Sequence, residues 1–229
     1  MKRLTDAQPP EPRPRTYLDG VRAAAPIGVA ALAFGVSYGV LARSAGWGRV
    51  APVVMSLTTF AGSAQFAAVS ILGAGGGLVT AVVAAVLLNL RYGPIGLSAA
   101  SAITGPWWKR LLTAQLIVDE SWAIAQRDDG RLDRHLLVGA GLLLLVGWTT
   151  GTVVGAFAGD LVADPESLGL DAAFPALFLA LLWPQVRDRT RLLAALGGAA
   201  IALALMPVTG AGVPIVVASL ACLIGVRRS

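Results

Sequence analysis

The sequence predicts an all-α integral membrane protein, a polytopic helical bundle of about six to eight transmembrane segments, some of them short or broken. Of the 229 residues, 56% are hydrophobic and only 14% are charged, and the mean hydropathy is +0.72. Soluble domains carry nearer a quarter charged residues. A helix that crosses the hydrocarbon core needs about 20 mostly apolar residues, so the chain accommodates at most about eight spans and no separate soluble domain.

Eight apolar segments follow one another with short loops between them. They cover about residues 21–42, 50–72, 78–98, 111–126, 135–158, 171–186, 191–206 and 211–226. Short loops indicate that all segments pack as one transmembrane domain, residues 17–229. Residues 1–16 contain four prolines in place of the apolar core of a secretory signal, so they are expected to form a disordered cytoplasmic tail. The segment at 111–126 is short and acidic, and it is expected to be either a shielded short span or a re-entrant helix.

Basic residues predict the orientation. If every segment spans, the tail, the loops at 127–134 and 187–191 and the C-terminus lie on one side, with the acidic loop at 159–171 opposite. Lys and Arg mark the cytoplasmic side, so both termini are predicted to be cytoplasmic. The pairs Arg43 with Arg49 and Lys109 with Arg110 would then lie outside, which makes six or seven spans plus re-entrant pieces the alternative. The net charge of +5 is scattered over short loops and does not indicate a nucleic-acid partner.

Polar residues interrupt the second apolar segment. At helical spacing, Thr59 and Ser63 lie on one stripe of small and hydroxyl-bearing side chains, and Gln65 lies off that stripe. Either this segment contacts protein on both sides, or its helix breaks near Gly62 and exposes backbone groups to a solute, as in the discontinuous helices of transporters. The other interpretation is helix–helix contact through hydroxyl and amide groups.

Polar residues also end the third segment, where Asn89 and Arg91 precede Gly93 and Pro94. Proline removes an amide donor and glycine weakens a helix, so a kink or unwound stretch is expected here. The guanidinium of Arg91 offers a planar fork of donors suited to a carboxylate. Alternatively, Arg91 extends from a helix end to the membrane surface.

Two adjacent carboxylates, Asp119 and Glu120, lie in the fourth segment. They are not expected to stay ionised together in an apolar run unless they are paired, because burial favours the neutral form. One of them is therefore a candidate proton carrier. Structural pairing with Arg91 is the alternative, and an ion pair that opens would combine both roles.

Glycines line faces of two segments, Gly28, Gly35 and Gly39 on the first and Gly147, Gly151 and Gly155 on the fifth. They predict close helix packing, either within the chain or against a second subunit. No pattern indicates an enzyme or a cofactor: there is no His/Cys cluster, no phosphate-binding loop and no nucleophile beside a base. The single cysteine, Cys222, excludes an internal disulfide.

Five sequence blocks occur in a recognisable order: GVRAAAPIGVAALAFGVSYG at 20–39, FAGSAQFAAVSIL at 60–72, LLNLRYGPIGLS at 87–98, VDESWAIA at 118–125 and DAAFPALFLALLWPQ at 171–185. Over about residues 19–226 they resemble the AzlC family of branched-chain amino acid permeases. The chain departs from the family at Gly93 and Pro94, where hydrophobic residues commonly follow the tyrosine. The resemblance implies an exporter of branched-chain and related neutral amino acids in the bacterial inner membrane. It also implies a small, separately encoded membrane subunit of the AzlD type.

The resulting hypothesis is a secondary transporter driven by the proton gradient. Arg91 with Asn89 is expected to bind the substrate carboxylate, and the side chains that line the site are expected to be Thr59, Ser63 and Gln65. Asp119, or else Glu120, is expected to couple protonation to transport, with Asp119 preferred because it aligns with Gln115. One alternative is a channel-like facilitator that uses the same polar residues without a titrating carboxylate. The other is a structural membrane subunit without a transport path of its own.

Overall fold

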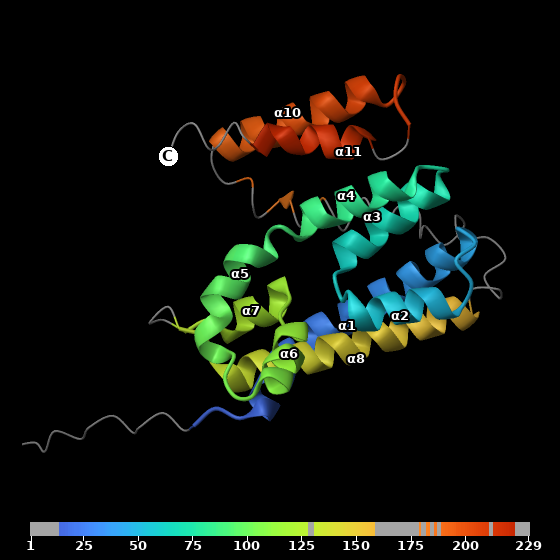
Figure 1. The fold of residues 1–229 in the computed structure, drawn as a ribbon. Helices are drawn as coiled ribbons and strands as arrows, with labels where there is room; N and C mark the ends of the chain where they lie inside the picture. Colours follow the sequence, from blue (N-terminus) through green and yellow to red (C-terminus); the bar gives the residue numbers. More distant parts are fainter. Residues whose placement is uncertain are drawn as a thin grey trace, which may run out of the picture.

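The computed structural model describes residues 14–127, 131–158, 189–210 and 213–222, together with Leu179, Leu182, Trp183 and Val186. Its regular elements are helices, which confirms the all-α class (Figure 1). They are α1 (Tyr17–Ser44), α2 (Val50–Thr58), α3 (Gly62–Gly73), α4 (Leu78–Asn89), α5 (Tyr92–Ala99), η1 (Ala100–Ala102), α6 (Trp107–Gln115), α7 (Asp119–Ala125), α8 (Arg134–Ala158), α10 (Arg189–Leu205), α11 (Val213–Ala218) and η3 (Ser219–Cys222).

Two long helices, α1 and α8, run side by side in the same direction (Figure 1). Gly20 near the start of α1 lies against Leu136 near the start of α8, and Gly39 lies against Thr152 further along. Each helix is long and apolar enough to cross a membrane. Thr16 and Asp19 begin α1 with a reciprocal cap, in which the Thr16 amide donates to the Asp19 carboxylate at 2.8 Å.

Glycines allow this close approach. A Cβ at Gly35 would overlap the carbonyl oxygen of Trp148, and a Cβ at Gly151 would overlap that of Leu32. Gly155 meets the Val36 carbonyl in the same way. The two predicted glycine faces therefore pack against each other within the chain.

The second apolar segment is a hairpin of two short helices. Its first helix, α2, starts near the end of α8, where the Arg49 guanidinium lies 5.7 Å from the centre of the Phe157 ring. At its tip, Gly62 begins α3 against the ring of Trp148 near the middle of α8. From there α3 returns, and Gly73 ends it beside Ala45 at the end of α1. The segment at 50–72 thus enters and leaves at the same end of the α1–α8 pair.

The bent pair α4 and α5–η1 is a third candidate span, with an angle of 41° at its break. It begins at the end of α1 where α3 finishes. It finishes at the opposite end of the α1–α8 pair. There the Arg134 side chain at the start of α8 donates to the Thr104 hydroxyl at 2.8 Å. The kink predicted beside Arg91 is confirmed. There the Gly93 amide bonds to the Leu90 carbonyl at 3.0 Å, which tightens the turn just before Pro94.

The fourth segment is a second hairpin, made of α6 and α7. It starts after Thr104, and it ends where the Asp133 amide donates to the Ala125 carbonyl at 2.8 Å, just before α8. Its tip reaches Gly141 of α8, which lies against the Leu116 carbonyl. Of the two expectations for this segment, this hairpin favours the re-entrant helix. Lys109 and Arg110 now fall at the same end as Arg131 and Arg134 before α8, so of the two dissenting pairs Arg43 with Arg49 still disagrees with the charge rule.

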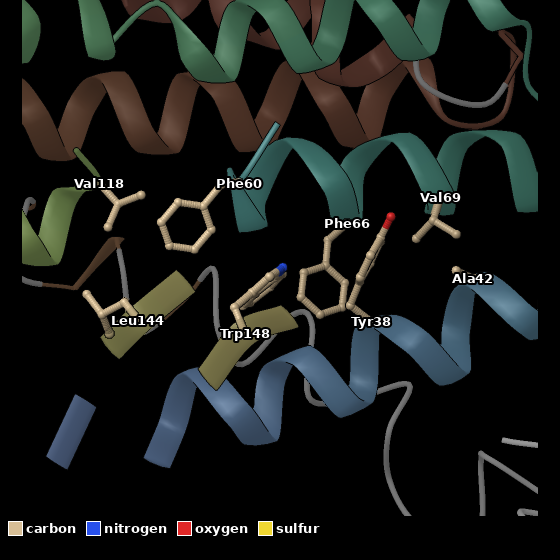
Figure 2. Packing of buried hydrophobic residues seen from close by; sticks show 8 residues of the cluster. All are labelled: Tyr38, Ala42, Phe60, Phe66, Val69, Val118, Leu144 and Trp148. Carbon is tan, nitrogen blue, oxygen red and sulfur yellow. The ribbon is translucent and has the colours of Figure 1, made fainter. Parts of the chain in front are cut away.

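The two hairpins therefore enter from opposite ends, and their tips meet beside the middle of α8. A span followed by a hairpin occurs twice in opposite directions, as in the inverted repeats of secondary transporters. The Gln115 side chain of α6 joins the tips by donating to the carbonyls of Leu57 at 2.9 Å and Thr58 at 3.2 Å. Figure 2 shows Phe60, Val118, Leu144 and Trp148 gathered at this meeting point.

The last described helices, α10 and α11, pack against each other, and α11 also contacts α4. Val216 of α11 packs against the cluster of Ile71, Ala81 and Ala84. Apart from four residues, the predicted segment at 171–186 lies outside the described residues, as do residues 1–13 of the predicted tail. The total of six to eight segments stays a prediction.

Candidate functional site

A cavity of about 130 Å³ lies where three helix interruptions converge between α1 and α8. The interruptions are the gap between α2 and α3, the bend between α4 and α5, and the gap between α6 and α7. The lining residues are Ile27, Ala30, Ala31 and Phe34 of α1, then Phe60, Gly62, Ser63, Arg91, Tyr92, Val118, Asp119 and Glu120 at the interruptions, and Leu144 and Trp148 of α8.

Arg91, at one interruption, contacts side chains at the other two. One guanidinium nitrogen, Nη2, lies 3.0 Å from the Asp119 carboxylate and donates to the Ser63 hydroxyl at 3.0 Å. The guanidinium carbon also lies 5.4 Å from the centre of the Tyr92 ring. The side chains of Arg91 and Asp119 remain 36% and 33% exposed, so a solute in the cavity has access to the pair. Arg91 Nε is buried without a hydrogen-bond partner. The side chain thus points into the protein and does not extend to a membrane surface.

The break near Gly62, one of the two expectations for the second segment, is confirmed. Phe60 has a φ of +40°, and in the described part of the chain it is the one non-glycine residue with positive φ. Ala61 follows with a φ of −139° and a ψ of 88°, outside the helical region. A Cβ at Gly62 would lie 2.9 Å from the Trp148 ring, so the close approach requires glycine. No side chain caps α3, so its first amides carry the partial positive charge of a helix N-terminus at this break.

Asp119 and Glu120 begin α7 at the tip of the second hairpin. The Ser121 hydroxyl holds this tip, accepting from the Val118 amide at 2.9 Å and donating to the Leu116 carbonyl at 2.8 Å. Asp119 is paired with Arg91, whereas no cation of the described residues lies within salt-bridge distance of Glu120. The cavity therefore holds one matched pair and a second carboxylate. Within the described chain, no group of three or more His, Cys, Asp or Glu residues is placed to hold a metal ion.

Gln65 lies apart from this cavity. It is fully buried, and its Nε2 donates to the Ser56 hydroxyl at 2.9 Å. Ser56 also accepts from Trp148 Nε1 at 3.1 Å and lies 2.9 Å from the Thr152 hydroxyl. This network connects α2, α3 and α8 behind the cavity. Neither Ser56 nor Trp148 was singled out from the sequence, since a lone serine or tryptophan in an apolar run has no local signature.

Thr59 and Asn89 line a second cavity, of about 280 Å³. Gln115 contributes to it as well, and the Oδ1 atom of Asn89 is buried without a partner. The structure thus brings Ser63, Arg91, Asp119 and Glu120 together. It separates Thr59 and Asn89 from them, and it places Gln65 in a third location.

The comparisons with known proteins agree with this architecture. Residues 26–162, which include both hairpins and both cavities, match the family model described as AzlC protein. An uncharacterized membrane protein of Archaeoglobus fulgidus is 32% identical over 200 residues, 86% of this chain and 87% of its own. The inner membrane protein YgaZ of Escherichia coli is 28% identical over 182 residues, 76% of this chain and 74% of its own. No solved structure gives a significant match.

A further relative carries a functional name. The branched-chain amino acid transport protein AzlC of Bacillus subtilis is 27% identical over 201 residues, 86% of this chain and 79% of its own. The membrane relatives and the spans in the structure confirm the predicted location in a cell membrane, which is the inner membrane for the Escherichia coli relative. Since the family model covers more than half of the chain, this protein belongs to the AzlC family.

Proposed function

We propose that this protein is a secondary transporter that exports branched-chain and related neutral amino acids across the inner membrane, with proton coupling. The observation that carries the proposal is the Arg91–Asp119 ion pair, 3.0 Å long, in a cavity formed at three helix interruptions. Family membership and the name of the Bacillus subtilis relative support the substrate class.

An amino acid zwitterion carries one negative and one positive group, and the ion pair offers an opposite charge to each of them. Its carboxylate would take the guanidinium of Arg91, with help from the Ser63 hydroxyl and the uncapped amides at the start of α3. Its ammonium group would take the carboxylate of Asp119. The charges of Arg91, Asp119 and the substrate each keep an opposite partner during binding. Substrate entry therefore leaves no unpaired charge in an apolar surrounding.

The remaining walls suit an aliphatic side chain. Ile27, Phe34, Phe60, Leu144 and Trp148 supply the apolar lining. Burial of apolar surface contributes about 25 cal/mol per Å², which favours branched aliphatic side chains over polar ones. A negatively charged substrate side chain would meet no further cation in this lining.

Glu120 is the better candidate for the proton-coupling residue. Asp119, preferred from the sequence, is occupied by Arg91, whereas Glu120 lines the same cavity without a cation in salt-bridge range among the described residues. A proton is the remaining counter-charge for Glu120. In this proposal its uptake and release change the net charge of the cavity by one unit in each transport cycle. A small AzlD-type membrane subunit completes the proposed transporter.

The test is flux through the purified protein, prepared together with an AzlD-type small membrane subunit. Proteoliposomes are loaded with labelled isoleucine, and export is followed with and without an uncoupler. The proposal expects export that collapses with the proton gradient and that is lost in Arg91→Gln. Arg110→Gln, an exposed arginine outside both cavities, is the matched control and should export normally. Export that ignores the gradient would support the channel-like facilitator.

A structural subunit gives a different result. In that case Arg91→Gln changes the yield of the complex, but the isoleucine flux per assembled complex stays the same. Quantifying the assembled complex in each vesicle preparation therefore separates a structural role from transport.

A further inference from the structure

The two cavities are neighbours and have two lining residues in common, Phe60 and Tyr92. On one side of these aromatic residues lie Arg91, Asp119 and Glu120. On the other side lie Thr59, Asn89 and Gln115. Phe60 is only 7% exposed, and because it lines both cavities it lies between the two groups.

We propose that Phe60 and Tyr92 form the closed barrier of the amino acid path, and that the cavity beyond them is a second substrate station. This inference rests on the proposed transport function. The path would then consist of a charged station at the ion pair and an uncharged station at Asn89, with the aromatic pair between them.

Both aromatic residues occupy helix interruptions, where a side chain moves without disrupting a continuous helix. Phe60 lies between α2 and α3 with a φ of +40°, which is unfavourable for a residue with a Cβ. Tyr92 directly follows Arg91 at the bend of α4 and α5. Sites of local backbone strain are typical of parts that switch between two conformations.

The charged station is linked to the barrier by direct contacts. The Arg91 guanidinium lies over the Tyr92 ring at 5.4 Å and donates to Ser63, which lies in the first turn of the helix that follows Phe60. A substrate carboxylate that draws Arg91 away from Asp119 therefore changes the surroundings of both aromatic rings. Substrate binding and barrier opening are coupled through this one side chain.

The second station has the chemistry of a site for release. None of the described residues that line it is charged, and Thr59, Asn89 and Gln115 offer only neutral hydrogen-bonding groups. The buried Oδ1 of Asn89 has no partner and is free to accept from an ammonium group. Neutral groups bind a zwitterion more weakly than an ion pair does, so a substrate that passes the barrier would dissociate readily.

Accessibility of single cysteines to a membrane-impermeant methanethiosulfonate tests the barrier. The background is Cys222→Ser, which removes the single native cysteine. Ala31→Cys reports on the charged station. Gly96→Cys reports on the second station, and no atom lies within 4 Å of the added Cβ. Right-side-out and inside-out membrane vesicles containing the full transporter are labelled separately.

With Phe60 present, the two cysteines are expected to react preferentially from opposite faces of the membrane. Phe60→Ala should abolish this preference for both, whereas Phe157→Ala, on the outer surface of α8, should preserve it. Phe60→Gly removes the ring while suiting the positive φ, so it gives the same result if the alanine variant folds poorly. Preferential labelling of both cysteines from the same face, or an unchanged preference after loss of the ring, would overturn the proposal.

Isoleucine flux measured in the same vesicles separates this inference from the proposed function. Absence of flux in the parent vesicles contradicts transport, while the labelling pattern still tests the barrier. Normal flux combined with unchanged labelling in Phe60→Gly contradicts the barrier alone.

Discussion

Arg91, at the bend between α4 and α5, and Asp119, in the hairpin of α6 and α7, meet at 3.0 Å inside a cavity between α1 and α8. Each residue lies at a helix interruption, and the Ser63 hydroxyl at a third interruption accepts a hydrogen bond from Arg91 at 3.0 Å. A charged pair in this position is available to a zwitterion, whereas a pair sealed in a packed core would serve only the fold.

Asp119→Asn should abolish isoleucine transport while leaving membrane insertion and complex yield intact. The amide still accepts a hydrogen bond from Arg91 but offers no charge to the substrate ammonium group. A hydrogen bond to a charged group contributes about 1.5–3 kcal/mol, so isoleucine affinity should fall by that amount. Equilibrium binding to the purified complex measures the loss. Wild-type affinity in Asp119→Asn would refute the proposed role of the carboxylate.

Glu120→Gln should remove the pH dependence of isoleucine export. The amide does not titrate, so the charge of the cavity stays constant. No side chain at position 120 then takes up or releases a proton in response to the gradient. Export rates measured across a pH series check this, with Glu120→Asp as the control because it retains a titrating group. A pH response equal to that of the wild type in Glu120→Gln would assign coupling to another residue.

Gly151→Ala should destabilise the protein without a direct effect on the cavity. The new Cβ overlaps the Leu32 carbonyl, and overpacking of this kind costs about 1–3 kcal/mol. Thermal unfolding of the detergent-solubilised protein measures the change. Gly93→Ala is the matched control, since no atom lies within 4 Å of its added Cβ. Equal stability of the two variants would contradict the close packing of α1 and α8.

Gln65→Leu should lower stability more than it lowers isoleucine affinity. Gln65 is fully buried and bonds to Ser56 outside the cavity, and loss of a buried hydrogen bond costs about 1–3 kcal/mol. Unfolding and isoleucine binding are measured on the same preparation. A large loss of affinity with unchanged stability would instead support the substrate contact expected from the sequence.

Local chemistry in the sequence predicted the interruptions well. The conflict between Gln65 and the Thr59–Ser63 stripe indicated either protein contact on both sides or a break near Gly62, because one continuous helix does not present all three side chains on the same face. Pro94 and its glycine neighbour indicated the bend at Arg91 for an equally local reason. The two carboxylates in a short apolar run left open a shielded short span or a re-entrant helix, and a proton carrier or pairing with Arg91.

The allocation of residues between the two cavities was not predictable from the sequence. Thr59 and Ser63 share a helical stripe by spacing, but the reversal at Phe60 sends them to different sides of the aromatic pair. Trp148 is part of the site because the two hairpin tips meet beside it on α8. Such placements depend on tertiary packing, which leaves no pattern in a single segment.

The most direct test of the central claim combines two variants with two charge-deleted ligands. Isoleucine, its 2-hydroxy acid analogue without an ammonium group, and its amide without a carboxylate are titrated into the wild type, Asp119→Asn and Arg91→Gln. We expect Asp119→Asn to weaken isoleucine but not the hydroxy acid, and Arg91→Gln to weaken isoleucine but not the amide. The coupling energy of such a cycle isolates one contact. Equal weakening of all three ligands by either variant would contradict a zwitterion held between Arg91 and Asp119.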